Sequence, residues 1–227
     1  MNRSVTAILG IALSASIWAK PPNELDATLT RLDRAGAAFR SMSAKIRRLS
    51  HTAAVNEDNI DSGTIFLKRV HARDVRMLID LTEPDRKTVA FQGHTVEIYY
   101  PKIQTVDEYD VSRYRELLEQ FFLLGFGTSR ADLESSYKMR WVSQETIAGQ
   151  KTDCLELIPK SKEVLQHLSK LEMWVADNGY PVQQKFYMKG GDYELATYSD
   201  MQINPNLPDS ALKLKLPGKV KREYPQK

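Results

Sequence analysis

Alternation of apolar and polar residues is clearest between residues 63 and 101 of the chain. This stretch holds four short apolar runs, and polar, proline and glycine residues interrupt them at positions 71–74, 83–85 and 92–94. Such breaks between period-2 runs are typical of hairpin turns. The pattern therefore predicts an antiparallel meander of four strands.

The meander has one consistently apolar face. In its first run Ile65, Leu67 and Arg69 fall on the same side, because side chains alternate along a strand. In the last run the apolar side is formed by Val96, Ile98 and Tyr100. The pattern predicts a curved sheet with an apolar concave side, and it places an arginine in line with aliphatic residues.

A helix and a long strand are predicted before the meander. Residues 23–38 carry Leu25, Leu29 and Leu32 at helical spacing, two prolines precede them, and Asn23 is suited to cap the first turn. From about Ser41 the apolar period changes to two, which indicates a strand. We expect the polar residues 56–62 to turn the chain from this strand into the meander.

Residues 112–124 form the most apolar predicted helix, and it ends in the sequence Gly-Phe-Gly. Its apolar stripe and the neighbouring phenylalanine comprise Tyr114, Leu117, Leu118, Phe121, Phe122 and Leu124. Two interpretations are open: the stripe packs in the core, or the helix is a mobile lid over an apolar concavity, with the glycines as its hinge. Ser129 and Asp132 indicate a second short helical turn.

The second half of the chain returns to strand patterns. We expect strands over residues 137–147, 151–158, 171–176, 182–188 and 193–203, with a tight hairpin at Asn178-Gly179 and a last short strand over 212–216. The fold class predicted is mainly β with added helices (α+β). Specifically, we expect an open, curved antiparallel sheet, an incomplete barrel covered by the N-terminal helix and by short lid helices.

Length and composition favour a single domain. A chain of 227 residues with 42% hydrophobic residues can bury one substantial core. We expect that domain to span residues 20–227, with a basic C-terminal tail that is either a solvated end or a docking site for an anionic membrane or acidic partner. The net charge of +3 is too small to indicate a nucleic-acid-binding protein.

Residues 1–19 are expected to form a cleavable signal peptide. Arg3 precedes an uncharged apolar run at residues 5–18, and Ala19 offers a cleavage point. The run is short for a membrane span. Cys154 is the only cysteine, so no thiol near the cleavage site can accept a lipid and no internal disulfide can form. We expect an exported chain without a lipid anchor, in which Cys154 is a half-buried apolar residue or a reactive thiol.

Catalytic motifs are not indicated. The four histidines are scattered, and Glu163 with His167 lacks the second histidine of a zinc-binding helix. There is no G-x-S-x-G motif, and the Gly-Phe-Gly sequence lacks the third glycine of a dinucleotide site. The acidic residues Asp107, Glu108 and Asp110 are suited to the start of the following helix, with acid/base chemistry as the alternative. The sequence therefore predicts no enzyme, no metal site and no cofactor.

The order of these features resembles the LolA family of periplasmic outer-membrane lipoprotein carriers, together with its LolB-like and RseB-like relatives. The segments that carry the resemblance are GTIFLKR, QGHTVEIYYP, LELIP, WVADNGYPV and LKLP, with the helices between them. They cover about residues 22–220. Three features depart from the pattern: Val70 replaces a proline, Gln92 replaces an acidic residue, and an aromatic residue often found near Glu97 is absent.

The resemblance implies a periplasmic carrier that binds acyl chains of lipoproteins without cofactor or covalent chemistry. Its partners would be acylated lipoproteins or other lipids, an inner-membrane release complex and an outer-membrane acceptor. Arg69 would be the latch that holds the helical lid closed. The hollow and lid would be formed by Leu25, Leu29, Leu32, Ile65, Leu67, Val96, Ile98, Tyr100, Leu117, Leu118, Phe121, Phe122 and Leu124. A carrier of another lipid, an RseB-like lipoprotein sensor and an exported enzyme for a hydrophobic substrate remain alternatives.

Overall fold

The computed structural model describes residues 23–71 and 74–226, so the predicted signal peptide lies outside the described residues. The helices are α1 (Glu24–Ala38), α2 (Arg115–Phe122) and α3 (Arg130–Ser136), with short 3-10 helices η1 (Pro101–Ile103), η2 (Ser112–Tyr114), η3 (Val164–Gln166), η4 (Lys189–Gly191) and η5 (Asp209–Leu212). The strands are β1 (Ser41–Thr52), β2 (Glu57–His71), β3 (Asp74–Glu83), β4 (Lys87–Gln92), β5 (Thr95–Tyr100), β6 (Thr105–Asp110), β7 (Tyr137–Ile147), β8 (Gln150–Pro159), β9 (Leu168–Ala176), β10 (Pro181–Met188), β11 (Tyr193–Ile203) and β12 (Lys221–Glu223).

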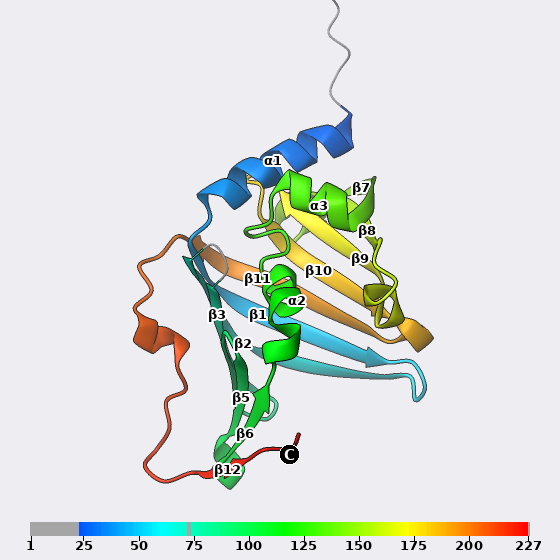
Figure 1. The fold of residues 1–227 in the computed structure, drawn as a ribbon. Helices are drawn as coiled ribbons and strands as arrows, with labels where there is room; N and C mark the ends of the chain where they lie inside the picture. The colour runs from blue at the N-terminus through cyan, green and yellow to red at the C-terminus, as the bar shows by residue number, and fades with distance from the viewer. Residues whose placement is uncertain (1–22, 72–73, 227) are drawn as a thin grey trace, which may run out of the picture.

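All described strands belong to one strongly curved sheet (Figure 1). Their order is β12-β6-β5-β4-β3-β2-β1-β11-β10-β9-β8-β7, and neighbours run antiparallel except β12 and β6, which are parallel. The two ends of the sheet, β7 and β12, do not pair with each other, so the barrel is incomplete. The predicted fold class is confirmed.

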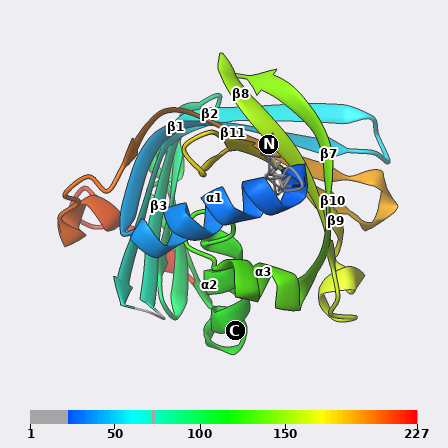
Figure 2. The same cartoon turned by 90° about the horizontal axis from the view of Figure 1, so that it is seen from above.

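The helices lie on the concave side and across the opening of the sheet. Seen from above, α1 crosses from the β3 side to the β7 side of the opening, and α2 and α3 lie beneath it (Figure 2). The Asn23 side chain caps α1 by accepting a hydrogen bond from the Leu25 amide at 3.1 Å, as the sequence predicts. Toward the other side of the opening, Arg31 of α1 forms an ion pair with Asp153 of β8, which ties the helix to the sheet.

The predicted meander is confirmed, but its first strand begins earlier than expected. β2 starts at Glu57, and β1 pairs with it along its full length, from Ser41 opposite Lys68 to Thr52 opposite Glu57. The prediction that residues 56–62 form the turn is therefore wrong, and the chain reverses at residues 53–56 instead. A backbone ladder needs no apolar side chains, so a polar segment extends the hairpin beyond the core.

The prediction of a last strand over residues 212–216 is also wrong. η5 ends at Leu212, and residues 213–216 form no strand. Leu212 is completely buried, and the Gln92 side chain donates a hydrogen bond to its carbonyl group. Strand β12 follows, and Arg222 within it contacts Glu97 and Glu108, each at 2.8 Å. The basic C-terminal segment is thus fastened to the sheet on both sides of residue 217.

The acidic residues before α2 are divided between two elements. Asp107 and Glu108 lie within β6, and Asp110 ends that strand. None of the three is the N-cap residue of η2 or α2, whose N-caps are Val111 and Tyr114. Asp110 lies nearest, and its carboxylate accepts a hydrogen bond from the Ser112 amide at 2.9 Å. Hydrogen bonds from Ser112 hold the pKa of Asp110 below its usual range.

Candidate functional site

The concave side of the sheet encloses an apolar cavity of about 490 Å³. Of the residues predicted for the hollow, the structure places Ile65, Leu67, Phe121 and Phe122 in its lining. Further apolar lining comes from residues that the sequence did not single out for this role: Met42, Ile46, Met77, Ile79, Phe126, Phe186 and Tyr198. The cavity therefore lies between strands of both halves of the sheet and the underside of α2.

The leucines of α1 contribute to a different part of the interior. Leu29 and Leu32 are buried with Leu124 in a cluster that includes residues of β8 and β9, and Leu25 packs against this cluster. None of the four lines the cavity. Their spacing marks the apolar face of each helix, but spacing alone does not tell which of two neighbouring cores that face meets.

The remaining predicted residues lie around the cavity rather than in it. Val96 and Leu118 pack against the cluster of buried residues that surrounds it. Leu117 is 44% exposed on α2, and Ile98 and Tyr100 are only partly buried on β5. β5 lies toward the β12 end of the sheet, and β4 separates it from β3, the nearest strand that lines the cavity.

α2 covers the cavity with two phenylalanines. The Phe121 ring lies 4.6 Å from the Phe186 ring of β10, measured between centroids. The Phe122 ring lies 5.0 Å from the Phe91 ring of β4. These two contacts reach opposite halves of the sheet, so α2 bridges the concavity from above.

The loop after α2 approaches the sheet closely because it contains glycines. Gly125 has a φ of 78°, and a Cβ there would come within 2.5 Å of the Met173 sulfur. Gly127 lies against Arg69, and a Cβ there would come within 1.9 Å of a guanidinium nitrogen. The two glycines therefore allow the loop to pack against the sheet, at Met173 and at Arg69.

Two side chains hold this loop by its carbonyl groups. The buried Gln184 amide donates to the Leu124 carbonyl at 3.1 Å, and Gln184 in turn accepts a hydrogen bond from the Tyr198 hydroxyl at 2.9 Å. Burial raises the pKa of Tyr198, so the hydroxyl stays protonated and remains a donor. This polar chain connects the loop after α2 to β10 and β11.

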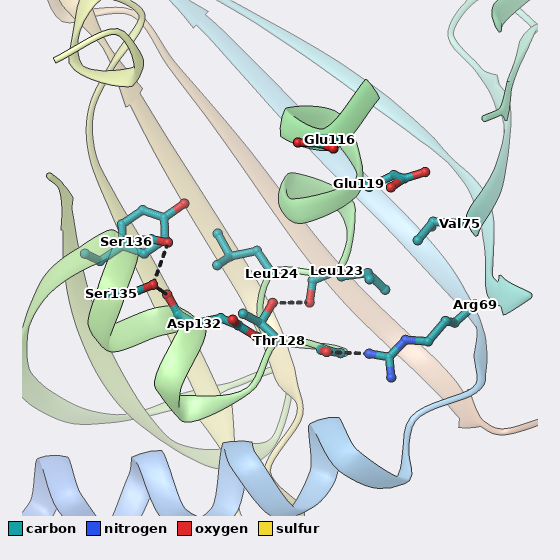
Figure 3. A pocket seen from close by; sticks show the side chains of 12 residues that line it. Arg69, Val75, Glu116, Glu119, Leu123, Leu124, Thr128, Asp132, Ser135 and Ser136 are labelled. Carbon is teal, nitrogen blue, oxygen red and sulfur yellow. Dashed lines mark hydrogen bonds between the residues drawn. The ribbon is translucent and has the colours of Figure 1, made fainter. Parts of the chain in front are cut away.

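Arg69 is the second tether, and it reaches the loop from β2 (Figure 3). Its Nη2 donates a hydrogen bond to the Gly127 carbonyl, and its guanidinium carbon lies 5.9 Å from the centre of the Phe39 ring. The Nε atom is buried without a hydrogen-bond partner, and burial lowers the pKa of Arg69. The arginine still carries its charge, since arginine is not deprotonated in proteins. Its role as a latch remains a prediction.

A second cavity, of about 430 Å³, lies beside this tether (Figure 3). It is lined by Arg69 and Val75 on one side and by α2, the glycine loop and α3 on the other. Glu119 of α2 faces it and is held by Arg115 at 2.8 Å. Movement of α2 would change the shape of both cavities.

The described residues carry little else that points to chemistry. Within residues 23–71 and 74–226, no three His, Cys, Asp or Glu side chains are grouped to hold a metal ion. In the same ranges no helix is long and apolar enough to cross a membrane. Cys154 is 2% exposed, and burial raises the pKa of its thiol to about 12. The thiol is therefore neutral at physiological pH.

Comparison with known proteins identifies the family. The model of the outer membrane lipoprotein carrier protein LolA matches residues 41–215, well over half of the chain. The chain belongs to the LolA family. This family is one of carriers, in keeping with an apolar cavity under a helical cover. No curated protein matches this LolA-family chain.

Solved structures share the fold at low sequence identity. An uncharacterised conserved protein from Thermus thermophilus has a TM-score of 0.53 and 10% identity, over 89% of this chain and 99% of the other. MucB has a TM-score of 0.52 and 17% identity, over 86% of this chain and 64% of MucB. The MucA/MucB complex of Pseudomonas aeruginosa gives 0.48 and 17%, over 84% and 61%. The LolA-family chain thus spans less than two thirds of MucB.

Proposed function

We propose that this LolA-family protein is a periplasmic carrier that binds the acyl chains of lipoproteins in the apolar cavity and conveys them toward the outer membrane. The observation that carries the proposal is the cavity of about 490 Å³ between the curved sheet and α2. Its size falls within the range of about 300–1,000 Å³ typical of small-molecule sites. Its lining is predominantly aliphatic and aromatic, which suits a hydrocarbon chain.

Burial of hydrocarbon supplies the binding energy in this proposal. Each buried CH₂ group contributes roughly 0.8 kcal/mol, so about ten methylenes contribute on the order of 8 kcal/mol before ordering costs. Phe121 and Phe122 already occupy part of the concavity, and they leave it when longer chains enter. The cost of exposing them lowers the net affinity, and a carrier needs this because it must also release its cargo.

The lid of the proposed carrier is α2 with the glycine loop that follows it. Arg69 holds the loop through the Gly127 carbonyl, and Gln184 holds it through the Leu124 carbonyl. In our proposal Arg69 is the latch, because its guanidinium exchanges a carbonyl partner for water when the lid lifts. Gln184 is fully enclosed and stays in place as the hinge anchor.

The proposal includes export, partners and the absence of catalysis. A signal peptide over residues 1–19 would direct the chain to the periplasm without a lipid anchor. The partners would be acylated lipoproteins, an inner-membrane release complex and an outer-membrane acceptor. The carrier would work without cofactor or covalent chemistry, and lifting α2 would be its only large movement.

The first test is native mass spectrometry of the protein purified from its own cells, with extraction of the lipids that copurify. We expect a bound acylated lipoprotein that can be passed to membranes carrying the acceptor. The variants Phe121→Ala and Arg69→Leu are expected to change the ratio of retained to released cargo while preserving the fold. Arg47→Leu is the matched control, because Arg47 is exposed on the same sheet. An unchanged ratio of retained to released cargo in both Phe121→Ala and Arg69→Leu would contradict the lid mechanism.

A carrier of another lipid is the second candidate. The observation that favours it is a set of charged side chains at one end of the cavity, where Arg48 and Glu194 contribute to the lining. A purely hydrocarbon ligand forms no hydrogen bond or ion pair with these charged side chains, whereas a lipid with a polar headgroup does. In the mass-spectrometry experiment, copurified phospholipid in place of lipoprotein would support this candidate.

A further inference from the structure

The concave face changes from apolar to charged along three neighbouring strands. On β1 the inward-facing residues Met42, Ala44 and Ile46 are buried, and the next inward-facing residue is Arg48. On β2 Asp61 occupies the corresponding position after Leu67, Ile65 and Gly63, and on β11 Glu194 follows Tyr198 and Ala196. The register places Arg48 opposite Asp61 and Ser50 opposite Glu194, so these charges lie side by side.

We call Arg48, Asp61, Glu194 and the adjacent Lys87 the charged row. Arg48 Nη2 lies 2.6 Å from Asp61 Oδ2, and Lys87 Nζ lies 3.3 Å from the same oxygen. The Ser50 hydroxyl donates to Glu194 Oε1 at 2.7 Å. Two cations and two anions thus share the row, and their formal charges cancel.

Arg48 and Glu194 also face each other within the charged row. Arg48 Nε and Glu194 Oε2 form an ion pair at 3.7 Å, and neither atom makes a hydrogen bond. This separation is longer than the roughly 2.7–2.9 Å of a charge-assisted hydrogen bond. Both residues line the apolar cavity, so the polar end of a ligand that fills the cavity would lie against this ion pair.

Position along the sheet gives the site an orientation. β1 begins three residues after the end of α1, so its apolar residues are near that helix and Arg48 is further along the strand (Figure 1). The Arg48 and Glu194 side chains are 38% and 32% exposed, so the row also meets solvent. A lipid in the cavity would therefore have its chains toward α1 and its polar end at the charged row.

We propose that the charged row binds the headgroup of a zwitterionic phospholipid whose acyl chains occupy the cavity. The phosphate accepts hydrogen bonds from Arg48, and the primary ammonium group donates to Glu194. Arginine suits phosphate because its N–H groups form charge-assisted hydrogen bonds with phosphate oxygens. A headgroup with both charges keeps the row neutral, whereas an anionic headgroup leaves Glu194 without a cation. The inference rests on the proposed function, because it assumes that the cavity takes acyl chains.

The test compares three lipids that have identical acyl chains and different headgroups. The full-length exported protein is incubated with vesicles that contain phosphatidylethanolamine, phosphatidylglycerol or diacylglycerol, and bound lipid is counted by native mass spectrometry. We expect phosphatidylethanolamine to be bound about tenfold better than diacylglycerol, since hydrogen bonds to charged groups are worth about that much. Arg48→Gln should lower binding of both phospholipids about tenfold. Glu194→Gln should lower binding of phosphatidylethanolamine alone.

Diacylglycerol binding serves as the internal control for folding and for the cavity. In each variant the headgroup effect is the ratio of phospholipid binding to diacylglycerol binding, and this ratio should be unchanged in Arg47→Gln, which removes an exposed arginine from the same strand. Uptake of all three lipids without any preference overturns the headgroup site and leaves the proposed carrier function standing. No uptake of any lipid, diacylglycerol included, overturns both.

Discussion

Replacing Gly127 by alanine should open the proposed lid, α2 with the loop that follows it, without removing any charge. The φ of Gly127 lies outside the left-handed region, so alanine causes no backbone strain. Its Cβ, however, would come within 1.9 Å of Arg69 Nη2 and 2.9 Å of the guanidinium carbon. The other near atom is the end of the Leu123 side chain, at 3.1 Å, and it can shift. The substitution therefore expels the arginine from its carbonyl partner and changes little else.

The size of the effect follows from the hydrogen bond that is lost. A hydrogen bond that involves a charged group contributes about 1.5–3 kcal/mol. Arg69 is only partly buried, so water replaces some of that interaction. We therefore expect the free energy that favours the closed lid over the open lid to fall by roughly 1–2 kcal/mol. A change of that size multiplies the population of the open lid by a factor of about 5–30.

Hydrogen exchange and lipid uptake measure this population directly. Amides of residues 115–127 should exchange faster in Gly127→Ala by about the same factor of 5–30, and uptake of a fluorescent fatty acid should accelerate in proportion. Amides of residues 143–147 and 150–154, at the Ile147 end of the β7–β8 ladder, are the internal reference, because the buried cluster at that end contains no residue of α2 or of the loop after it. Their exchange should not change.

A double-mutant cycle separates the latch from a general loosening of the loop. Arg69→Leu alone should accelerate exchange as much as Gly127→Ala does. In the presence of Arg69→Leu, Gly127→Ala should add nothing, because both changes remove one interaction. Additive effects, or unchanged exchange of α2 in either single variant, would refute the argument that Arg69 restrains the lid through Gly127.

Three further outcomes are expected. Cys154, with its buried thiol and a pKa raised to about 12, should react with a thiol reagent at pH 8 only after unfolding, and rapid native labelling would contradict its enclosure. Asp153→Asn should lower the free energy of unfolding by about 1–3 kcal/mol at pH 7. Burial works to raise the pKa of Asp153, but hydrogen bonds from Trp141 and Arg31 outweigh it and lower the pKa. The difference in free energy of unfolding between wild type and Asp153→Asn is therefore present above the ordinary pKa of about 3.9, and it should vanish as the pH falls through the lowered pKa. Thermal melts of both proteins at pH 7 and at a pH below the lowered pKa check this. Leu212→Ala should expose the C-terminal segment to limited proteolysis at a cost of about 2–5 kcal/mol, and unchanged cleavage would show that other contacts hold it.

Local patterns were sufficient for most of the architecture. The turns of the meander depend on proline, glycine and polar residues at the breaks, and these act within a few residues. The cap of α1 at Asn23 and that of α3 at Ser129 are likewise local, since each side chain accepts a hydrogen bond from an amide two or three residues ahead. The curved open sheet follows from many such strands with one apolar face each.

Tertiary structure decided which apolar residues line the cavity. Leu29 and Phe121 have the same helical spacing and hydrophobicity in the sequence, yet one is buried against β8 and β9 and the other contacts Phe186 over the cavity. The difference arises from where each helix lies on the sheet, and residues far along the chain determine that position. The same holds for η5 and β12, whose partners are more than a hundred residues away.

The charged row shows the distinction most clearly. Arg48 and Glu194 are 146 positions apart by their numbers, and in the sequence each is one of several charged residues within a strand pattern. Only the register of β1 with β2 and β11 brings them to the same end of the cavity. The sequence by itself determined most of the strands, the caps of α1 and α3 and the apolar face of each element, because their causes are local. The cavity, the lid contacts and the charged row were decided by strand pairing and helix packing, which join residues that have no local relation.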